Sequence, residues 1–136
     1  MLKELSIRNF TLISEATIAF SNGFTAITGE TGAGKSVLLK ALRAVCGEKV
    51  SATAIRSGSD KASIEASFDI TQNKKVQDLL KNFEIDCDEE LILHREISST
   101  GKSRARINGV LVPIANLQTI GDELLQLHGQ SEQLLL

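Results

Sequence analysis

Eight consecutive residues combine the side-chain types and the spacing that bind phosphate in proteins. They match the pattern G-x-x-x-x-G-K-[ST] at every defined position, and they are Gly29, Glu30, Thr31, Gly32, Ala33, Gly34, Lys35 and Ser36. Glycines let backbone N–H groups curl around a phosphate at distances that a Cβ would obstruct. The lysine can reach the β and γ phosphates, and the final hydroxyl can ligate Mg²⁺. The sequence therefore predicts a P-loop that binds a nucleoside triphosphate.

The residues around this loop have the periodicity that a P-loop requires, with a strand before it and a helix after it. Residues 2–10 alternate polar and apolar side chains, residues 15–20 form a second predicted strand, and residues 24–28 are a short apolar run that leads into the loop. After the loop, apolar residues recur at helical spacing up to Val45, and Gly47 follows as a C-terminal cap. This context argues against the alternative, a glycine-rich turn that matches by chance.

The remaining sequence predicts mainly strands. We expect a connecting loop over 48–61, a strand over 62–70, an amphipathic helix over 73–83, strands over 91–97 and 104–107, a tight hairpin at Asn108 and Gly109 leading into 110–112, and a helix from Pro113 to about residue 120. Residues 123–127 fit either a strand or the end of a helix, and their pattern does not separate the two.

Length and composition indicate one compact domain of a soluble, cytoplasmic protein. The 136 residues, 42% of them hydrophobic, suffice for one core of ordinary size. The formal net charge of −2 excludes the overall basic field of a dedicated nucleic-acid binder, so any contact with DNA must be local. No segment approaches the roughly 18 apolar residues of a membrane span. Cys46 and Cys87 have no partner at metal-ligand spacing and are interpreted as free, reduced thiols.

The order of these features resembles the heads of ABC-type ATPases, because two strands and 28 residues precede the loop. Asn9 and Phe10, followed by Gly23, the loop and Ala41, are similar to the N-terminal half of the SMC, Rad50 and RecN group of chromosome and repair ATPases. Four stretches resemble the RecN family of bacterial DNA repair proteins in order and spacing, namely GETGAGKS, IRSG (55–58), KSRARING (102–109) and LHGQSEQLLL (127–136). Thr11 is a departure, because related heads often have a basic residue there, near the nucleotide, and how the base is held is left open.

The resemblance implies an α/β fold: the N-terminal lobe of an ABC-type P-loop ATPase head, with a mixed sheet around the P-loop helix and an antiparallel β subdomain. Residues 1–136 would be the N-terminal part of a head that a long antiparallel coiled coil splits in two, and the chain stops without a cap, turn or polar tail. The other half would supply the Walker B acidic pair, the catalytic glutamate and the signature motif. The resemblance also implies ATP and Mg²⁺ as cofactors, DNA as a partner of the full-length protein, a homodimer of heads, no membrane contact, and a nucleoid-associated location.

The resemblance assigns roles to two further residues. Gln130 falls on the Q-loop, whose glutamine contacts Mg²⁺ and the attacking water; an amide can ligate and donate without changing its charge. Arg56 lies 20 positions after Ser36, where SMC-like heads place an arginine that can approach nucleotide or DNA. The alternatives are an ordinary surface glutamine and a solvated loop arginine.

Other polar residues have weaker claims to a function. Lys102, Arg104 and Arg106 alternate along a predicted strand, so they share one face and either contact DNA phosphates or form a solvated surface. His94 and His128 have no acidic or cysteine neighbour at ligand spacing and are interpreted as structural. The acidic pair Glu89 and Glu90 lacks the preceding apolar strand of a Walker B motif.

Several functions compete for this sequence. The first is the ATPase head of a RecN-like repair protein, and the second is the nucleotide-binding subunit of an ABC transporter, which usually stacks adenine on an upstream aromatic. The chain has no Tyr or Trp, and only phenylalanines such as Phe10 are available for that stacking. A small P-loop kinase would need its loop nearer the N-terminus, together with a lid. The chain by itself is also consistent with a module that holds nucleotide without hydrolysing it.

Overall fold

The computed structural model describes residues 2–20 and 32–127, with side chains from Ser36 to Leu125 in the second range. The elements are β1 (Leu2–Phe10), β2 (Ile13–Ala19), α2 (Gly32–Val45), a 3₁₀ turn (Ala52–Ala54), β3 (Lys61–Asp69), α3 (Lys74–Asn82), β4 (Glu90–Ser98), β5 (Ser103–Ile107), β6 (Val110–Val112) and α4 (Ile114–Leu127). The strands and helices predicted within these ranges are confirmed, with shifts of a few residues at their ends. The predicted strand at 24–28 lies outside the described residues.

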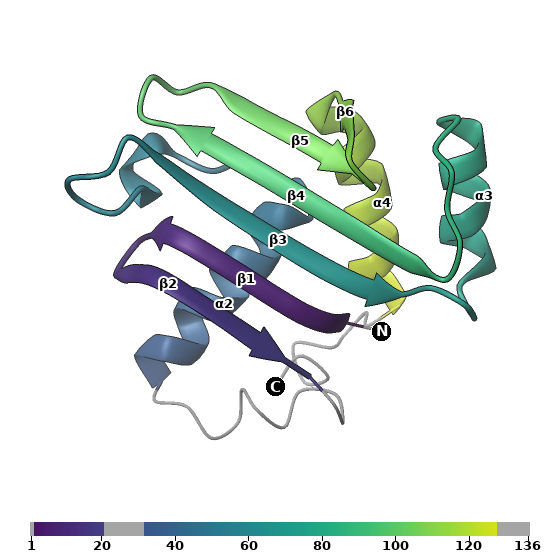
Figure 1. The fold of residues 1–136 in the computed structure, drawn as a ribbon, viewed down its shortest axis with the longest axis horizontal. Helices are drawn as coiled ribbons and strands as arrows, with labels where there is room; N and C mark the ends of the chain where they lie inside the picture. The colour runs from purple at the N-terminus through teal and green to yellow at the C-terminus, as the bar shows by residue number, and fades with distance from the viewer. Residues whose placement is uncertain (1, 21–31, 128–136) are drawn as a thin grey trace.

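The six strands form one twisted sheet with the order β2-β1-β3-β4-β5-β6, and every neighbouring pair is antiparallel (Figure 1). Consecutive strands are neighbours except where β3 pairs with β1, after the chain has passed through α2. All the described strands pair antiparallel, and the predicted strand at 24–28 lies outside the described residues, so the expectation of a mixed sheet stays a prediction.

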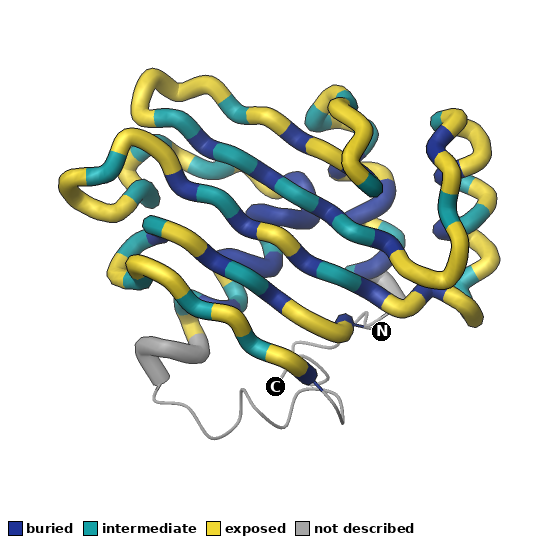
Figure 2. Tube along the Cα trace, in the orientation of Figure 1, coloured by how far each residue is buried: buried dark blue, intermediate teal, exposed yellow. Residues whose placement is uncertain are grey.

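Alternation along the strands gives the sheet one dry face and one wet face (Figure 2). In β3, Ala62, Ile64, Ala66 and Phe68 are buried, while the residues between them are partly or fully exposed. Period-two alternation places the apolar set of each strand on one side, where the helices cover it. The wet face carries Ser, Thr, Glu, His and Arg side chains.

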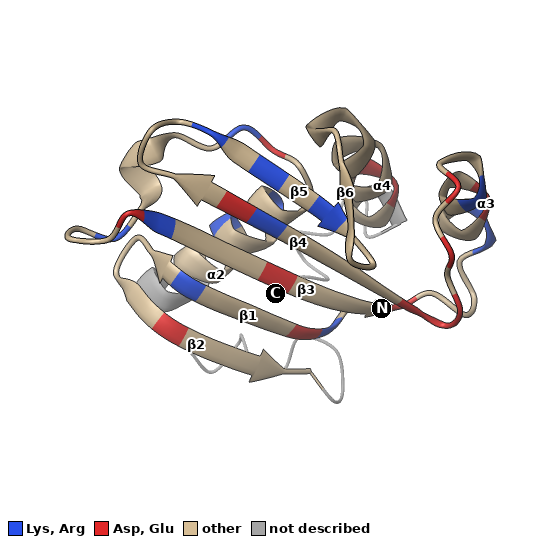
Figure 3. Cartoon of the chain, turned by 45° about the horizontal axis from the view of Figure 1, so that its top comes forward, with Lys and Arg blue, Asp and Glu red and all other residues tan. Residues whose placement is uncertain are grey.

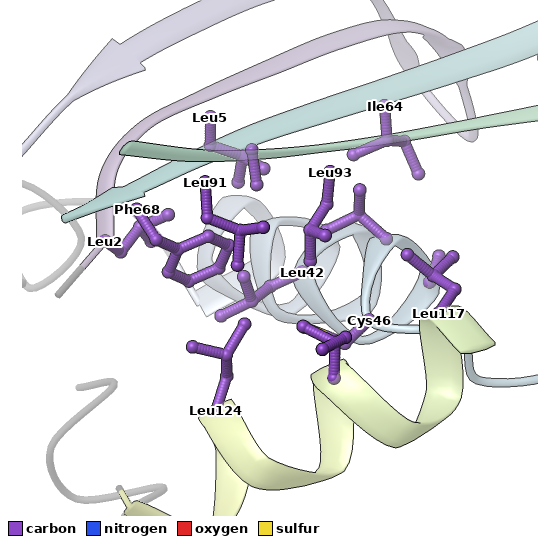
Figure 4. Packing of buried hydrophobic residues seen from close by; sticks show 14 of the residues in the cluster. Leu2, Leu5, Leu42, Cys46, Ile64, Phe68, Leu91, Leu93, Leu117 and Leu124 are labelled. Carbon is purple, nitrogen blue, oxygen red and sulfur yellow. The ribbon is translucent and has the colours of Figure 1, made fainter. Parts of the chain in front are cut away.

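Helices α2 and α4 cover the dry face of the sheet. Figure 4 shows Leu42 of α2, and Cys46 just after this helix, lying between Leu91 and Leu93 of the sheet and the buried leucines of α4. The core also includes the inward residues of β1 and β3, so α2 is held by burial along most of its length. This packing positions the helix that follows the phosphate loop.

The helix ends agree with the local sequence. Asn73 is the N-cap of α3, with its side chain accepting from the backbone N–H of Val76 at 3.1 Å. Residues 123–127, left open by their pattern, are the last turns of α4. No helix in the described part of the chain is long and apolar enough to span a membrane.

Two glycines lie where α2 ends against α4. Gly47 has a φ of +98°, the left-handed conformation expected of a C-terminal cap. Gly121 of α4 lies so close to α2 that a Cβ on it would be 2.0 Å from the carbonyl oxygen of Cys46. The two helices therefore approach more closely than any larger residue would allow.

Candidate nucleotide-binding site

The phosphate-loop motif leads directly into the N-terminus of α2. Gly32, the fourth residue of the motif, is the first residue of the helix, so Ala33, Gly34, Lys35 and Ser36 belong to its first turns. Ser36 is exposed. Gly29, Glu30 and Thr31 lie outside the described residues, as do the side chains of the motif before Ser36. The helix predicted after the loop is confirmed, while the roles of the individual residues stay predictions.

The described end of this helix is compatible with a bound anion. The N-terminus of a helix has unpaired N–H groups and the positive end of the helix dipole, which favour a phosphate. The first turn of α2 contains no acidic residue to oppose that field. The exposed hydroxyl of Ser36 is an oxygen ligand of the kind that Mg²⁺ prefers. These residues fit a magnesium–nucleotide complex.

Arg56 lies beside the C-terminal end of β1, although the two are far apart in the sequence. Its backbone N–H donates to the carbonyl of Asn9 at 2.8 Å, and the N–H of Thr11 donates to the carbonyl of Ala54 at 2.6 Å. An isolated β-bridge between Phe10 and Ile55 completes the contact. The structure thus brings together two of the stretches that resembled the SMC-like group. The Arg56 side chain is exposed, and its role is untested.

A hollow of about 450 Å³ opens next to this contact, between the end of β1, α2 and residues 48–54. Lys40 and Lys49 line it together with Glu48. Lys40 is four residues after Ser36, about 6 Å further along the helix axis. Thr11 also lines this hollow, and its Oγ1 atom is buried without a hydrogen-bond partner among the described atoms. Thr11 has a φ of +50°, which is uncommon for a β-branched residue.

The three basic residues of the KSRARING stretch are exposed, as their alternation predicted. Arg104 and Arg106 lie on the wet face of β5, opposite Glu96 and His94 of β4, and Lys102 precedes the strand. Figure 3 shows basic and no acidic positions on β5, whereas β1, β3 and β4 carry residues of both signs. Contact of these residues with DNA stays a prediction. Gln130 and His128 lie outside the described residues.

A comparison with models of known protein families identifies the family of this chain. A family model described as an AAA domain matches residues 4–136. The chain belongs to the AAA domain family. Members are expected to bind nucleotide, and the exposed start of α2 described above is compatible with that.

Curated relatives of this AAA domain are named DNA repair protein RecN. The protein of Bacillus subtilis (strain 168) is 44% identical over 137 residues, which cover 100% of this chain and 24% of that protein. The protein of Vibrio cholerae serotype O1 is 41% identical over 130 residues, which cover 96% of this chain and 24% of that protein. The chain therefore spans about a quarter of the length of these relatives.

A solved SMC ATPase structure shares the fold. Its TM-score to this chain is 0.70 at 24% sequence identity, and the match covers 91% of this chain and 79% of that one. That structure is described under the subject of ATP-driven dimerization and DNA-stimulated activation of SMC ATPases. The expected fold, the N-terminal lobe of an SMC-like P-loop ATPase head, is confirmed.

The sequence analysis missed one buried residue of this AAA domain, Arg95. Its neighbours Leu91, Leu93 and Ile97 face the core at every second position of β4, and the same alternation turns Arg95 inward. Among the described residues it is the only charged one that is buried, at 3% exposure. An arginine in phase with three buried apolar residues was the signal that could have identified it.

The structure places two of the other polar candidates on β4, and their interpretation as structural residues stays a prediction. Glu90 begins β4 and pairs with Lys3 at 3.3 Å, and His94 lies on the wet face of the same strand. No group of three or more metal-ligating side chains occurs in the ranges that the structure describes. Both cysteines are free; Cys46 is buried and Cys87 is partly exposed.

Proposed function

We propose that this chain is the ATP-binding N-terminal part of the head of a RecN-like ATPase that acts in recombinational repair of DNA double-strand breaks. The observation that carries the proposal is a complete phosphate-loop motif at the N-terminus of α2, within a head-like sheet-and-helix layout. The relatives are about four times as long as the match, so residues 1–136 would be one half of a head whose other half lies elsewhere in a longer protein.

In this proposal each group of the loop has its own task. Backbone N–H groups of residues 29–34 surround the phosphates, Lys35 contacts the β and γ phosphates, and Ser36 ligates Mg²⁺. Magnesium supplies charge neutralisation at the phosphates when it is bound. Gln130 would help to hold the metal and to orient water, and Arg56 would approach the nucleotide or DNA from the end of β1.

The partners we propose are DNA and a second head. The SMC protein with the same fold is described in terms of ATP-driven dimerization and stimulation by DNA, and we extend both properties to the complete protein that carries this chain. Within the chain, Lys102, Arg104 and Arg106 present an exposed positive strip that suits the phosphate backbone. A RecN-like repair protein would work at the nucleoid, in the cytoplasm. The relatives are named as repair proteins, and this gives no support to the alternative of an ABC transporter subunit.

The test is nucleotide binding by a Lys35→Ala variant, measured by calorimetry on the protein that carries this chain. We expect the affinity for magnesium–ATP to fall by at least about 100-fold, which corresponds to about 2.7 kcal/mol, because the lysine contacts the terminal phosphates. Lys74→Ala is the matched control, since Lys74 is exposed in the first turn of α3 and lies outside the motif. Equal ATP affinity in wild type and Lys35→Ala would refute the proposal.

A further inference from the structure

Arg95 connects the sheet to the C-terminal end of the P-loop helix. Its Nη1 donates to the carbonyl of Ala44 at 2.7 Å and to the carbonyl of Glu48, just beyond α2. Its Nε donates to the hydroxyl of Ser103 on β5 at 3.0 Å. One guanidinium thus contacts β5 and the last turn of the helix whose first turn holds the phosphate loop.

The position of this charge has a physical reason. Burial of a cation is costly unless hydrogen bonds replace its hydration, and desolvation lowers the pKa of Arg95. The partners of its Nη1 are main-chain carbonyls at and just beyond the C-terminal end of α2. This is the negative end of the helix dipole, which favours a cation. The carbonyl of Ala44 also accepts from the backbone N–H of Gly47 at 3.1 Å, so the contact with Arg95 is a second, charged hydrogen bond at this helix end. Displacing Arg95 would therefore leave its buried charge without these partners.

Ser103 connects this buried contact to the exposed positive strip, the basic strip formed by Lys102, Arg104 and Arg106. Lys102 and Arg104 flank Ser103 in the sequence and are exposed, whereas the Ser103 hydroxyl contacts Arg95. A polyanion that contacts Lys102 and Arg104 acts on the same short stretch of backbone that holds Ser103. One hydrogen bond joins this stretch to Arg95, and two more join Arg95 to the last turn of α2 and to Glu48 just beyond it.

We propose that Arg95 is a positioning residue, and that it and Ser103 transmit the binding of duplex DNA at β5 to the P-loop helix. The inference rests on the proposed function, because it requires ATP at the loop and DNA at the basic strip. It adds a specific route between the two sites, made of Ser103, Arg95 and the carbonyls of Ala44 and Glu48. Coupling of this kind is reciprocal, so bound ATP also changes the affinity for DNA.

The experiment uses the complete protein that carries this chain and the variant Ser103→Ala. The variant removes the acceptor of Nε but leaves the two carbonyl contacts of Arg95 in place. The quantities are kcat and KM for ATP hydrolysis with and without saturating linear duplex DNA, and the affinity for a non-hydrolysable ATP analogue under both conditions. Ser99→Ala is the matched control, because Ser99 is exposed in the same hairpin.

In wild type and Ser99→Ala we expect DNA to change kcat or the analogue affinity on the order of fivefold or more. In Ser103→Ala the ratio of the values measured with and without DNA falls below about twofold. The ATP affinity without DNA and the affinity for DNA stay within about twofold of wild type. A purely structural role would lower the melting temperature and leave the ratio unchanged. If Ser103→Ala is too unstable, Arg95→Lys, which keeps the charge but loses the forked geometry, replaces it and is expected to lose the same ratio.

Two results would overturn the inference: a wild-type ratio in Ser103→Ala, or no effect of DNA on the nucleotide site of the wild-type protein. Failure of the proposed function differs from both, because the wild-type protein would then not bind ATP through Lys35 at all.

Discussion

Two cysteines on the same chain differ sharply in their surroundings. Cys46 is buried where α2 meets α4, and burial, assisted by the nearby charges of Asp122 and Glu48, raises its pKa to about 12. Cys87 lies before β4 and is partly exposed; desolvation raises its pKa as well, but solvent reaches it. The thiolate is the reactive form, so both the pKa and access limit Cys46.

We therefore expect an alkylating reagent at pH 8 to label Cys87 and to leave Cys46 unmodified in the folded protein. Because the pKa of Cys46 lies far above this range, its thiolate stays a minute fraction even at pH 9, so raising the pH from 7 to 9 should bring measurable labelling to Cys87 only. Peptide mapping by mass spectrometry measures both sites. In denaturant the two thiols should react at similar rates, and fast labelling of native Cys46 would contradict the packing of α2 on α4.

A second prediction at the scale of single residues concerns Gln130, whose proposed task depends on one side-chain amide. In the complete protein, Gln130→Ala should leave ATP affinity within about threefold of wild type and lower kcat on the order of 100-fold, as for the loss of one positioned polar group. Calorimetry and steady-state phosphate release separate the two effects. Hydrolysis at the wild-type rate would show that Gln130 is an ordinary surface residue.

At the scale of elements, the contact between α2 and α4 depends on the absence of a side chain. A Cβ at residue 121 would also lie 2.7 Å from the Cβ of Cys46, so both main chain and side chain oppose it. Arg95 holds the same end of α2 from the opposite side. The end of the P-loop helix is thus fixed by one close approach and one buried charge.

Gly121→Ala should destabilise the protein by about 1–3 kcal/mol, the usual cost of overpacking, although alanine favours a helix by about 1 kcal/mol over glycine. Thermal unfolding measures the change, and we expect the melting temperature to fall by several degrees. Thr119→Ala is the control, because Thr119 is exposed on the same helix and its hydroxyl contacts only the carbonyl of Ala115. An equal or higher melting temperature in Gly121→Ala would mean that the two helices are further apart than described.

At the scale of the whole molecule, the proposed function gives this chain one part of a hydrolytic site. Hydrolysis requires a carboxylate that orients water, a second acidic group at the metal, and charge stabilisation from an opposing head. In the proposal these groups belong to the other half of the head, and Glu89 and Glu90 do not replace them, because Glu90 pairs with Lys3 at the start of β4.

We expect the 136-residue chain alone to show no ATPase activity above background, even at high concentration. A dimer of this chain would lack the same groups as the monomer. Phosphate release by the purified chain is the measurement, with Lys35→Ala as the control for contaminating enzymes. Steady release that Lys35→Ala abolishes would show that the chain is a complete small NTPase.

Local patterns in the sequence determined a large part of this molecule. The phosphate loop could be identified because its residues are contiguous, and strands such as β3 could be placed because burial on one face leaves a period of two. Asn108 and Gly109 predicted a hairpin, and both have the positive φ that such a turn requires. The same alternation predicted that Arg104 and Arg106 share the wet face.

Only the tertiary structure decided which of these elements meet. The pairing of β3 with β1 placed Arg56 beside Asn9, and the packing of α2 under β4 placed the carbonyl of Ala44 next to Arg95, 51 positions away in the sequence. Such contacts have no local periodicity, because they depend on how the strands are ordered and on which helix covers them. A buried charge and a missing side chain at Gly121 have meaning only once the opposing surface is known, and here that surface is the end of the P-loop helix.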